Sequence, residues 1–152
     1  MPFAASSSPL RPAPEWARQA DDRWLFVYGT LRRGFGRHGL LSKLGARFVA
    51  SGRVPGALYN LGRFPGAIEE EPGWIYGEVY SLPDPRRAFR LLDAVEEFHP
   101  RAPEASFFRR ARTAVAPSGE GEPCLSGQAW IYWLNRKVPA MRRIDSGDYA
   151  RP

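Results

Sequence analysis

Several residue types are scarce in this chain of 152 residues. Its one cysteine, Cys124, cannot form a disulfide within the chain, and we assign it no functional role. No apolar stretch is long enough to span a membrane. The first residues also lack the basic start and apolar segment of a secretory leader. We therefore expect no membrane association and a cytoplasmic location.

Lysine is scarce as well, because only Lys43 and Lys137 accompany the arginines behind the net charge of +6. An arginine-rich chain can bind phosphate groups, so an RNA-binding barrel with aromatic surfaces is one alternative interpretation. The arginines are, however, scattered from Arg11 to Arg151 rather than gathered into one basic segment. No recognised nucleic-acid motif accompanies them, which argues against a nucleic-acid partner.

The composition suits one folded domain. Hydrophobic residues make up 43% of the sequence, which is enough for a single core. Residues 1–22 are rich in alanine, serine and proline and show no hydrophobic periodicity. Such a segment is typical of a flexible tail. We expect the folded domain to span residues 23–152.

An apolar run near the start ends in a turn that contains glycine. Trp24–Val27 is rich in bulky and β-branched residues and predicts a buried strand. Gly29 follows it, and glycine allows a tight loop that exposes backbone N–H groups. Fixed N–H dipoles suit a carboxylate or a developing oxyanion. An ordinary turn from strand to loop is the alternative.

A helix is predicted to begin after Asp84. Asp84 is a good N-cap, and Pro85 suits the first helical position, where a missing N–H has no consequence. The apolar residues of the segment form one stripe: Ala88, Phe89, Leu91, Leu92 and Val95. This stripe predicts which side of the helix packs on the core.

Two adjacent glutamates close this helix. Glu96 lies one turn beyond Leu92 and points toward the core side, whereas Glu97 shares the polar side with Asp93 and Arg90. Burial and the negative end of the helix dipole should both raise the pKa of Glu96. Such a glutamate suits general acid–base catalysis near neutral pH. A glutamate satisfied by a neighbouring arginine is the alternative.

Further strands follow along the chain. They are predicted at Arg53–Leu61, Trp74–Leu82, Phe107–Ala116 and Leu125–Trp133. A short helix at Leu40–Leu44 comes before them and ends at Gly45. In the segment 74–82, Ile75 and Val79 share one face while aromatic residues occupy the other. Neither face is simply polar, which suits a curved sheet partly covered by helices or loops.

Other residues invite functional hypotheses. His38 and His99 lie in loop-like sequence without partners at metal-ligand spacing, so we interpret them as solvated and predict no metal site. Glu69–Glu71 precedes Pro-Gly, which is typical of an exposed loop. Tyr132 and Tyr149 can both pack and form hydrogen bonds, so each is either a core residue or part of a substrate pocket.

Several short motifs occur in one order along most of the chain. They are Tyr28-Gly29-Thr30-Leu31-Arg32, the segment 56–66, Gly77-Glu78-Val79-Tyr80, Leu92-Asp93-Ala94-Val95-Glu96, Phe108-Arg109-Arg110, Ala129-Trp130-Ile131-Tyr132 and the segment 144–149. Together, from Trp24 to Tyr149, they resemble the γ-glutamylcyclotransferase family, including its AIG2-like branch. The set is more specific for the fold than for one substrate.

The resemblance implies an α+β domain built on a small mixed β-barrel with a few short helices. It also implies an intramolecular reaction, in which the free α-amine of a γ-glutamyl group attacks its own side-chain carbonyl. Pyroglutamate and an amine are released. Glu96 would act as general acid and base, carrying the proton from the attacking amine to the leaving amine. Small γ-glutamyl compounds are the implied substrates, with no cofactor or metal, and the oligomeric state stays open.

Residues beside the strand end would hold the γ-glutamyl group. The predicted substrate-binding residues are Tyr28, Gly29, Thr30, Leu31 and Arg32, together with Tyr132 and Tyr149. Arg32 or Arg33 could pair with a carboxylate of the substrate, although arginines beside a loop are often only solvated. Because cyclisation joins two groups of one molecule, the enzyme has to supply only the positioning of the substrate and the transfer of a proton.

Two positions depart from the family pattern. Glu97 stands where the family often has glycine, so the choice between Glu96 and Glu97 needs a test. Phe108 stands where a tyrosine is common, so any role of that hydroxyl is absent. The second departure predicts a different choice of substrate. Separately, a domain of this fold that has lost catalysis and only binds a small molecule is a further alternative.

Overall fold

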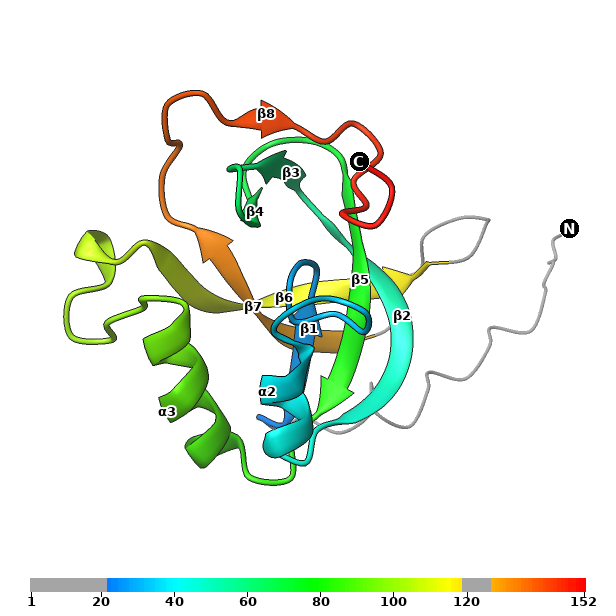
Figure 1. The fold of residues 1–152 in the computed structure, drawn as a ribbon, viewed down its shortest axis with the longest axis vertical. Coiled ribbons are helices and arrows are strands. Elements are labelled where there is room, and N and C mark those ends of the chain that lie inside the picture. Colours follow the sequence, from blue (N-terminus) through cyan, green and yellow to red (C-terminus); the bar gives the residue numbers. More distant parts are fainter. Residues whose placement is uncertain (1–21, 119–126) are drawn as a thin grey trace, which may run out of the picture.

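The computed structural model describes residues 22–118 and 127–152. Cys124 and residues 1–21 of the predicted tail lie outside the described residues. The barrel strands are β1 (Trp24–Val27), β2 (Arg47–Pro55), β5 (Trp74–Ser81), β6 (Phe108–Pro117) and β7 (Gly127–Leu134). They close in the order β1-β5-β2-β6-β7 (Figure 1). The barrel is mixed, because β1 runs antiparallel to β5 and parallel to β7.

A smaller sheet and short helices complete the fold. The sheet has the order β4-β3-β8 and comprises β3 (Ala57–Asn60), β4 (Pro65–Ile68) and β8 (Arg142–Arg143). The helices are α2 (His38–Lys43), α3 (Pro85–Val95) and the 3₁₀ turn η1 (Pro103–Ala105). Figure 1 shows the small sheet toward one end of the barrel and α2 and α3 toward the other. The predicted α+β class and small mixed barrel are confirmed.

Strand β1 is buried along its whole length because both of its faces are covered. Trp24 and Phe26 point into the barrel interior, where they join the inner core. Leu25 and Val27 point outward and join a second core beneath the helices. A strand buried on both sides has no polar face, which explains the unbroken apolar run in the sequence.

The domain is stabilised by two hydrophobic cores, one inside the barrel and one between the barrel and the helices. The inner core fills the barrel with side chains that include Val54, Ile75, Val79, Val115, Ile131 and Trp133. The outer core packs the helices on the barrel through Leu41, Leu82, Phe89, Leu92 and Tyr132, among others. The predicted division of strand β5 is therefore observed, with one face in the interior and the other covered by helices and loops.

The predicted strand Arg53–Leu61 is wrong in its limits, because β2 ends at Pro55 and β3 begins at Ala57. Gly56 separates them with φ of +147°, and a Cβ there would lie 3.0 Å from the Ile68 carbonyl oxygen. Only glycine allows this change of direction without strain. The chain thereby leaves the barrel and enters the small sheet, whose strands β4 and β8 were not predicted.

Helix α3 begins as expected but buries a different side. The Asp84 carboxylate accepts the Arg87 backbone N–H at 3.2 Å, and Pro85 is the first helical residue. Leu91, expected in the buried stripe, is exposed, whereas Asp93, expected on the polar side, is only 8% exposed. The prediction was wrong for both residues. Asp93 is buried because it finds polar partners on the barrel, which offset the cost of its burial.

No helix among the described residues combines the length and the apolar character needed to cross a membrane.

Candidate active site

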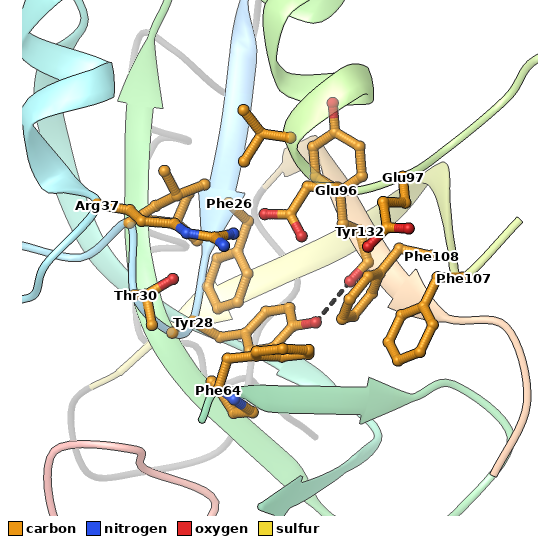
Figure 2. Close-up of a pocket in the computed structure, with 15 residues that line it drawn as sticks. Phe26, Tyr28, Thr30, Arg37, Phe64, Glu96, Glu97, Phe107, Phe108 and Tyr132 are labelled. Carbon is orange, nitrogen blue, oxygen red and sulfur yellow. Dashed lines mark hydrogen bonds between the residues drawn. The ribbon is translucent and has the colours of Figure 1, made fainter. Parts of the chain in front are cut away.

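A hollow of about 590 Å³, counted to its open mouth, lies between the end of β1 and the end of α3. It is lined by Phe26, Val27, Tyr28, Gly29, Thr30, Leu31, Arg37, Phe64, Pro65, Val95, Glu96, Glu97, Phe107, Phe108 and Tyr132. Figure 2 shows these residues as sticks. Aromatic side chains form much of the lining, and charged groups come from only three of these residues. The hollow can therefore enclose a small polar molecule among aromatic side chains and a few polar groups.

The first wall of the hollow is the loop 28–38, which we call the cradle loop. Its carbonyl groups are engaged within the loop, since the Gly29 oxygen accepts the Arg32 N–H at 3.0 Å and the Thr30 oxygen accepts the Arg37 N–H at 2.9 Å. Among the described residues, the backbone N–H groups of residues 29–31 have no hydrogen-bond acceptor. Because residues 29–31 also line the hollow, these unbonded N–H groups are candidate donors for a ligand there.

Gly29 is required by close packing rather than by a left-handed backbone. A Cβ at this position would lie 2.5 Å from Cγ of Pro65, the first residue of β4. Any larger residue would push the loop and the small sheet apart. Glycine therefore lets the small sheet pack directly against the cradle loop.

The second wall is the end of α3. Glu96 follows the last helical residue, and its backbone N–H still donates to the Leu92 oxygen at 2.8 Å, so it keeps the helical path. Glu97 has φ of +53° and turns the chain away. Its carbonyl accepts the Phe107 N–H at 3.2 Å, which ties this turn to the segment leading into β6. As a result Glu96 is half-buried, whereas Glu97 is exposed at the edge of the hollow.

Burial gives Glu96 its chemical character. Burial raises the pKa of the Glu96 carboxyl from its ordinary value of 4.5 to about 7, and the charge of Arg37 opposes this rise. Burial also raises the pKa of both Tyr28 and Tyr132, whose hydroxyls therefore stay protonated near neutral pH. A carboxyl with a pKa near 7 can both accept and return a proton under those conditions.

A polar network under the hollow fixes the end of α3 to the barrel. Arg110 donates two hydrogen bonds to the Asp93 carboxylate, at 2.9 and 3.2 Å. The Tyr132 hydroxyl donates to the same carboxylate at 2.6 Å. The Tyr28 hydroxyl in turn donates to the Tyr132 carbonyl at 2.6 Å, the dashed bond in Figure 2. Because Asp93 lies one turn before Glu96, this network also sets where Glu96 stands.

The structure brings most of the predicted site residues together. Glu96, Tyr28, Gly29, Thr30, Leu31 and Tyr132 all line the hollow. Arg32 does not, because its guanidinium donates to Asp148 at 2.7 Å. Tyr149 does not either, and its ring packs on Phe35 with centroids 5.3 Å apart. We leave these two residues out of the proposed site.

Some lining residues were not predicted. Arg37 lines the hollow because the cradle loop folds back on Thr30, and nothing in the local sequence distinguishes Arg37 from the many other arginines. Phe64 and Pro65 were missed as site residues because strand β4 was missed.

His38 is not simply solvated. Its Nδ1 donates to the Leu31 carbonyl at 2.9 Å, and its ring lies 5.7 Å from that of Tyr80. The histidine is half-buried, because α2 begins beside the cradle loop and packs on the barrel. Within residues 22–118 and 127–152, no group of three or more histidine, cysteine, aspartate and glutamate side chains is arranged to hold a metal ion.

Comparisons with known proteins agree with this architecture. The sequence model of the family described as γ-glutamyl cyclotransferase, AIG2-like, matches residues 25–151. A protein of Vibrio cholerae serotype O1, named provisionally as a γ-glutamylcyclotransferase, is 33% identical over 129 residues. That match covers 84% of this chain and 95% of the relative.

Two further proteins extend the comparison. The γ-glutamylcyclotransferase family protein YtfP of Escherichia coli K12 is 29% identical over 126 residues, covering 82% of this chain and 94% of the relative. A crystal structure of an AIG2-like protein from mouse superposes with a TM-score of 0.58 at 24% identity. It covers 77% of this chain and 80% of the mouse chain, and it supports the fold alone.

Proposed function

We propose, because this chain belongs to the γ-glutamyl cyclotransferase, AIG2-like family, that it releases pyroglutamate from small γ-glutamyl compounds. The α-amine forms a bond to the γ-carbonyl carbon, and the bond from that carbon to the leaving amine breaks. The observation that carries the proposal is that Glu96 lines the same hollow as the unbonded N–H groups of residues 29–31. We expect the reaction to take place in the cytoplasm.

Glu96 acts as the proton carrier. With a pKa raised to about 7 by burial, a useful fraction of its carboxyl groups is ionised at neutral pH. The carboxylate takes the proton that the α-amine loses on attack, and the resulting acid gives it to the leaving nitrogen. The proton is returned within one turnover, so this route calls for no cofactor. The rate should depend on an apparent pKa near 7.

The cradle loop stabilises the charge that develops on the carbonyl oxygen. The loop carbonyls of Gly29 and Thr30 are already bonded, so the loop holds its shape before a ligand arrives. The N–H groups of residues 29–31 can then donate to the oxyanion without reorganising. Phe64 and Phe108 on the lining exclude water and strengthen these interactions.

The test is a panel of γ-glutamyl amino acids, peptides and amines, with pyroglutamate as the measured product. Wild type, Glu96→Gln and Glu97→Gln are compared. Glu96→Gln should lower turnover by at least about a hundredfold, because the amide cannot accept the proton. Glu97→Gln should retain turnover, because the Glu97 side chain is exposed.

Each other outcome has a distinct meaning. Loss of turnover in Glu97→Gln alone would overturn the assignment of Glu96. Binding of pyroglutamate without release of product from any compound would identify a binding module that has lost catalysis. Salt-sensitive RNA retention without cyclisation would favour the arginine-rich alternative.

A further inference from the structure

Arg37 is a second charged residue that faces Glu96 in the hollow. Figure 2 shows its guanidinium and the Glu96 carboxylate directed toward one another across the open space. Both residues belong to the lining, and the Arg37 charge lowers the pKa of Glu96. No ion pair joins them directly. The space between a positive and a negative group is therefore available to a ligand that carries both charges.

The backbone of Arg37 is held firmly beside the predicted binding residues. Its N–H donates to the Thr30 carbonyl at 2.9 Å. The next residue, His38, is held by its Nδ1 bond to the Leu31 carbonyl at 2.9 Å and by its N–H bond to the Phe35 carbonyl at 3.2 Å. These bonds fix the base of the side chain relative to the cradle loop, although Arg37 as a whole residue is exposed.

Arg37 differs from the neighbouring arginines in having its donors unused. Arg32 binds Asp148, and Arg33 lies 3.5 Å from the Glu78 carboxylate. In the described part of the chain, the Arg37 guanidinium has no hydrogen-bond or ion-pair partner. A guanidinium offers paired donors that match the two oxygens of a carboxylate, so a free one at a hollow favours a carboxylate ligand.

The head group of a γ-glutamyl compound fits this arrangement. Its α-amine and α-carboxylate are attached to one carbon, so a head group placed between Glu96 and Arg37 offers the amine to the first and the carboxylate to the second. The γ-carbonyl must lie close to the amine for ring closure. Its oxygen is then directed to the N–H groups of residues 29–31, which stay free for the oxyanion.

We propose that Arg37 binds the α-carboxylate of the γ-glutamyl group and thereby orients the α-amine toward Glu96. The assignment rests on the proposed function for the identity of the ligand. It has one chemical consequence: a bound carboxylate compensates the Arg37 charge, so Arg37 no longer lowers the pKa of Glu96. Glu96 thus becomes a stronger base when the substrate is in place.

The test compares two ligands that differ in the carboxylate alone. Pyroglutamate carries it, and 2-pyrrolidinone is the same ring without it. Their dissociation constants are measured by NMR titration for wild type, Arg37→Gln and Arg37→Lys. Wild type should bind pyroglutamate at least about tenfold more tightly. Arg37→Gln should lose this preference, and Arg37→Lys should keep part of it because the charge remains.

Arg33→Gln is the matched control, since it removes the same charge from the same loop at a side chain outside the lining. It should keep the preference for pyroglutamate. The inference is overturned if wild type shows no preference, if Arg37→Gln keeps it, or if Arg37→Gln weakens both ligands equally.

Turnover of the γ-glutamyl panel separates this inference from the proposed function. If wild type turns over the panel and Arg37→Gln still prefers pyroglutamate to 2-pyrrolidinone, the role of Arg37 is refuted while the proposed function stands. If wild type shows no turnover but prefers pyroglutamate, and Arg37→Gln loses that preference, the carboxylate site is supported and the cyclisation is refuted.

Discussion

The two walls of the hollow are stabilised in different ways. The backbone of the cradle loop is folded mainly by bonds between residues close in sequence, such as the His38 bond to Leu31, seven positions away, while its side chains also reach distant residues such as Asp148. The end of α3 is held from a distance, because Asp93 binds Tyr132 across 39 positions and Arg110 across 17. The backbone shape of the first wall is thus set mainly by local bonds, whereas the position of the second depends on the barrel.

This difference predicts what each wall tolerates. A change in the cradle loop should alter the shape of the site while most of the barrel packing stays intact. A change at Asp93 should weaken the attachment of a whole helix and leave a charged partner on the barrel unpaired. Substitutions in the cradle loop should therefore lower activity more than stability. Substitutions at Asp93 should lower the free energy of unfolding strongly.

The largest effect is expected from Asp93→Ala. It leaves the Arg110 guanidinium, whose side chain is only 19% exposed, without its carboxylate partner. Removing one member of a buried pair costs about 3–5 kcal/mol. The free energy of unfolding in urea measures this loss. Glu69→Ala is the matched control, because it breaks an exposed pair with Arg109 and should cost less than about 1 kcal/mol. Similar losses in both variants would contradict a structural role for Asp93.

The second prediction concerns pH and Glu96, which belongs to the second wall. The pKa of Glu96 is raised from 4.5 to about 7 in the folded state, so the folded protein binds this proton more tightly than the unfolded chain. The resulting stabilisation is fully present below pH 4.5 and is lost as the pH rises through about 7. The shift corresponds to at most about 3 kcal/mol, and the partial exposure of Glu96 reduces it.

Urea unfolding of wild type and Glu96→Gln across this pH range measures the effect. The stability of wild type should fall relative to that of Glu96→Gln as the pH rises, because the variant has no proton to lose. Other carboxylates contribute equally to both proteins and cancel in the difference. A difference that stays constant with pH would show that Glu96 is not sheltered in the folded state.

The same contrast between local and distant contacts explains what the sequence could predict. The strand at Trp24–Val27 and the Asp84 cap depend on neighbouring residues, so local patterns were enough, whereas Gly29 is required by its packing on the distant Pro65. The sequence analysis also expected Glu97 to be more exposed than Glu96, although the structure produces this difference by the left-handed turn at Glu97 rather than by helix phase. The fold itself was predicted from the family resemblance, which depends on the order of the short motifs along the chain.

The errors arose where distant segments decide the outcome. The helical pattern places Asp93 on the polar side of α3. Its burial is favourable because Arg110 and Tyr132, which are distant in sequence, bind its carboxylate. Gly56 stands inside an apparently continuous strand, and the break depends on Ile68 packing against it. Arg37 reaches the hollow through a bond to Thr30 that no periodicity indicates.

Gly29→Ala tests how the cradle loop packs on the small sheet, with a smaller expected effect. The new Cβ would lie 2.5 Å from Pro65 Cγ, so the loop or the small sheet must shift. We expect a loss of about 1–3 kcal/mol in stability. A shift of about 1 Å at the cradle would lower kcat/KM about a hundredfold. Gly36→Ala is the control in the same loop, because a Cβ there has no neighbour within 4 Å. Equal activity of the two variants would contradict a role for the close packing.

The smallest effect is expected from Glu97→Gly, and it has the opposite sign. Glu97 adopts φ of +53°, where a side chain costs about 1–2 kcal/mol, whereas glycine loses about 0.5–1 kcal/mol through the flexibility of the unfolded chain. The variant should therefore gain roughly 0.5–1 kcal/mol in the free energy of unfolding. Ala140→Gly is the matched control, since Ala140 has φ of +64° and lies outside the lining.

Because the second wall needs the turn at Glu97 rather than its charge, Glu97→Gly should gain as much stability as Ala140→Gly and keep its turnover. A gain in Ala140→Gly without one in Glu97→Gly would mean that the Glu97 side chain itself stabilises the end of α3.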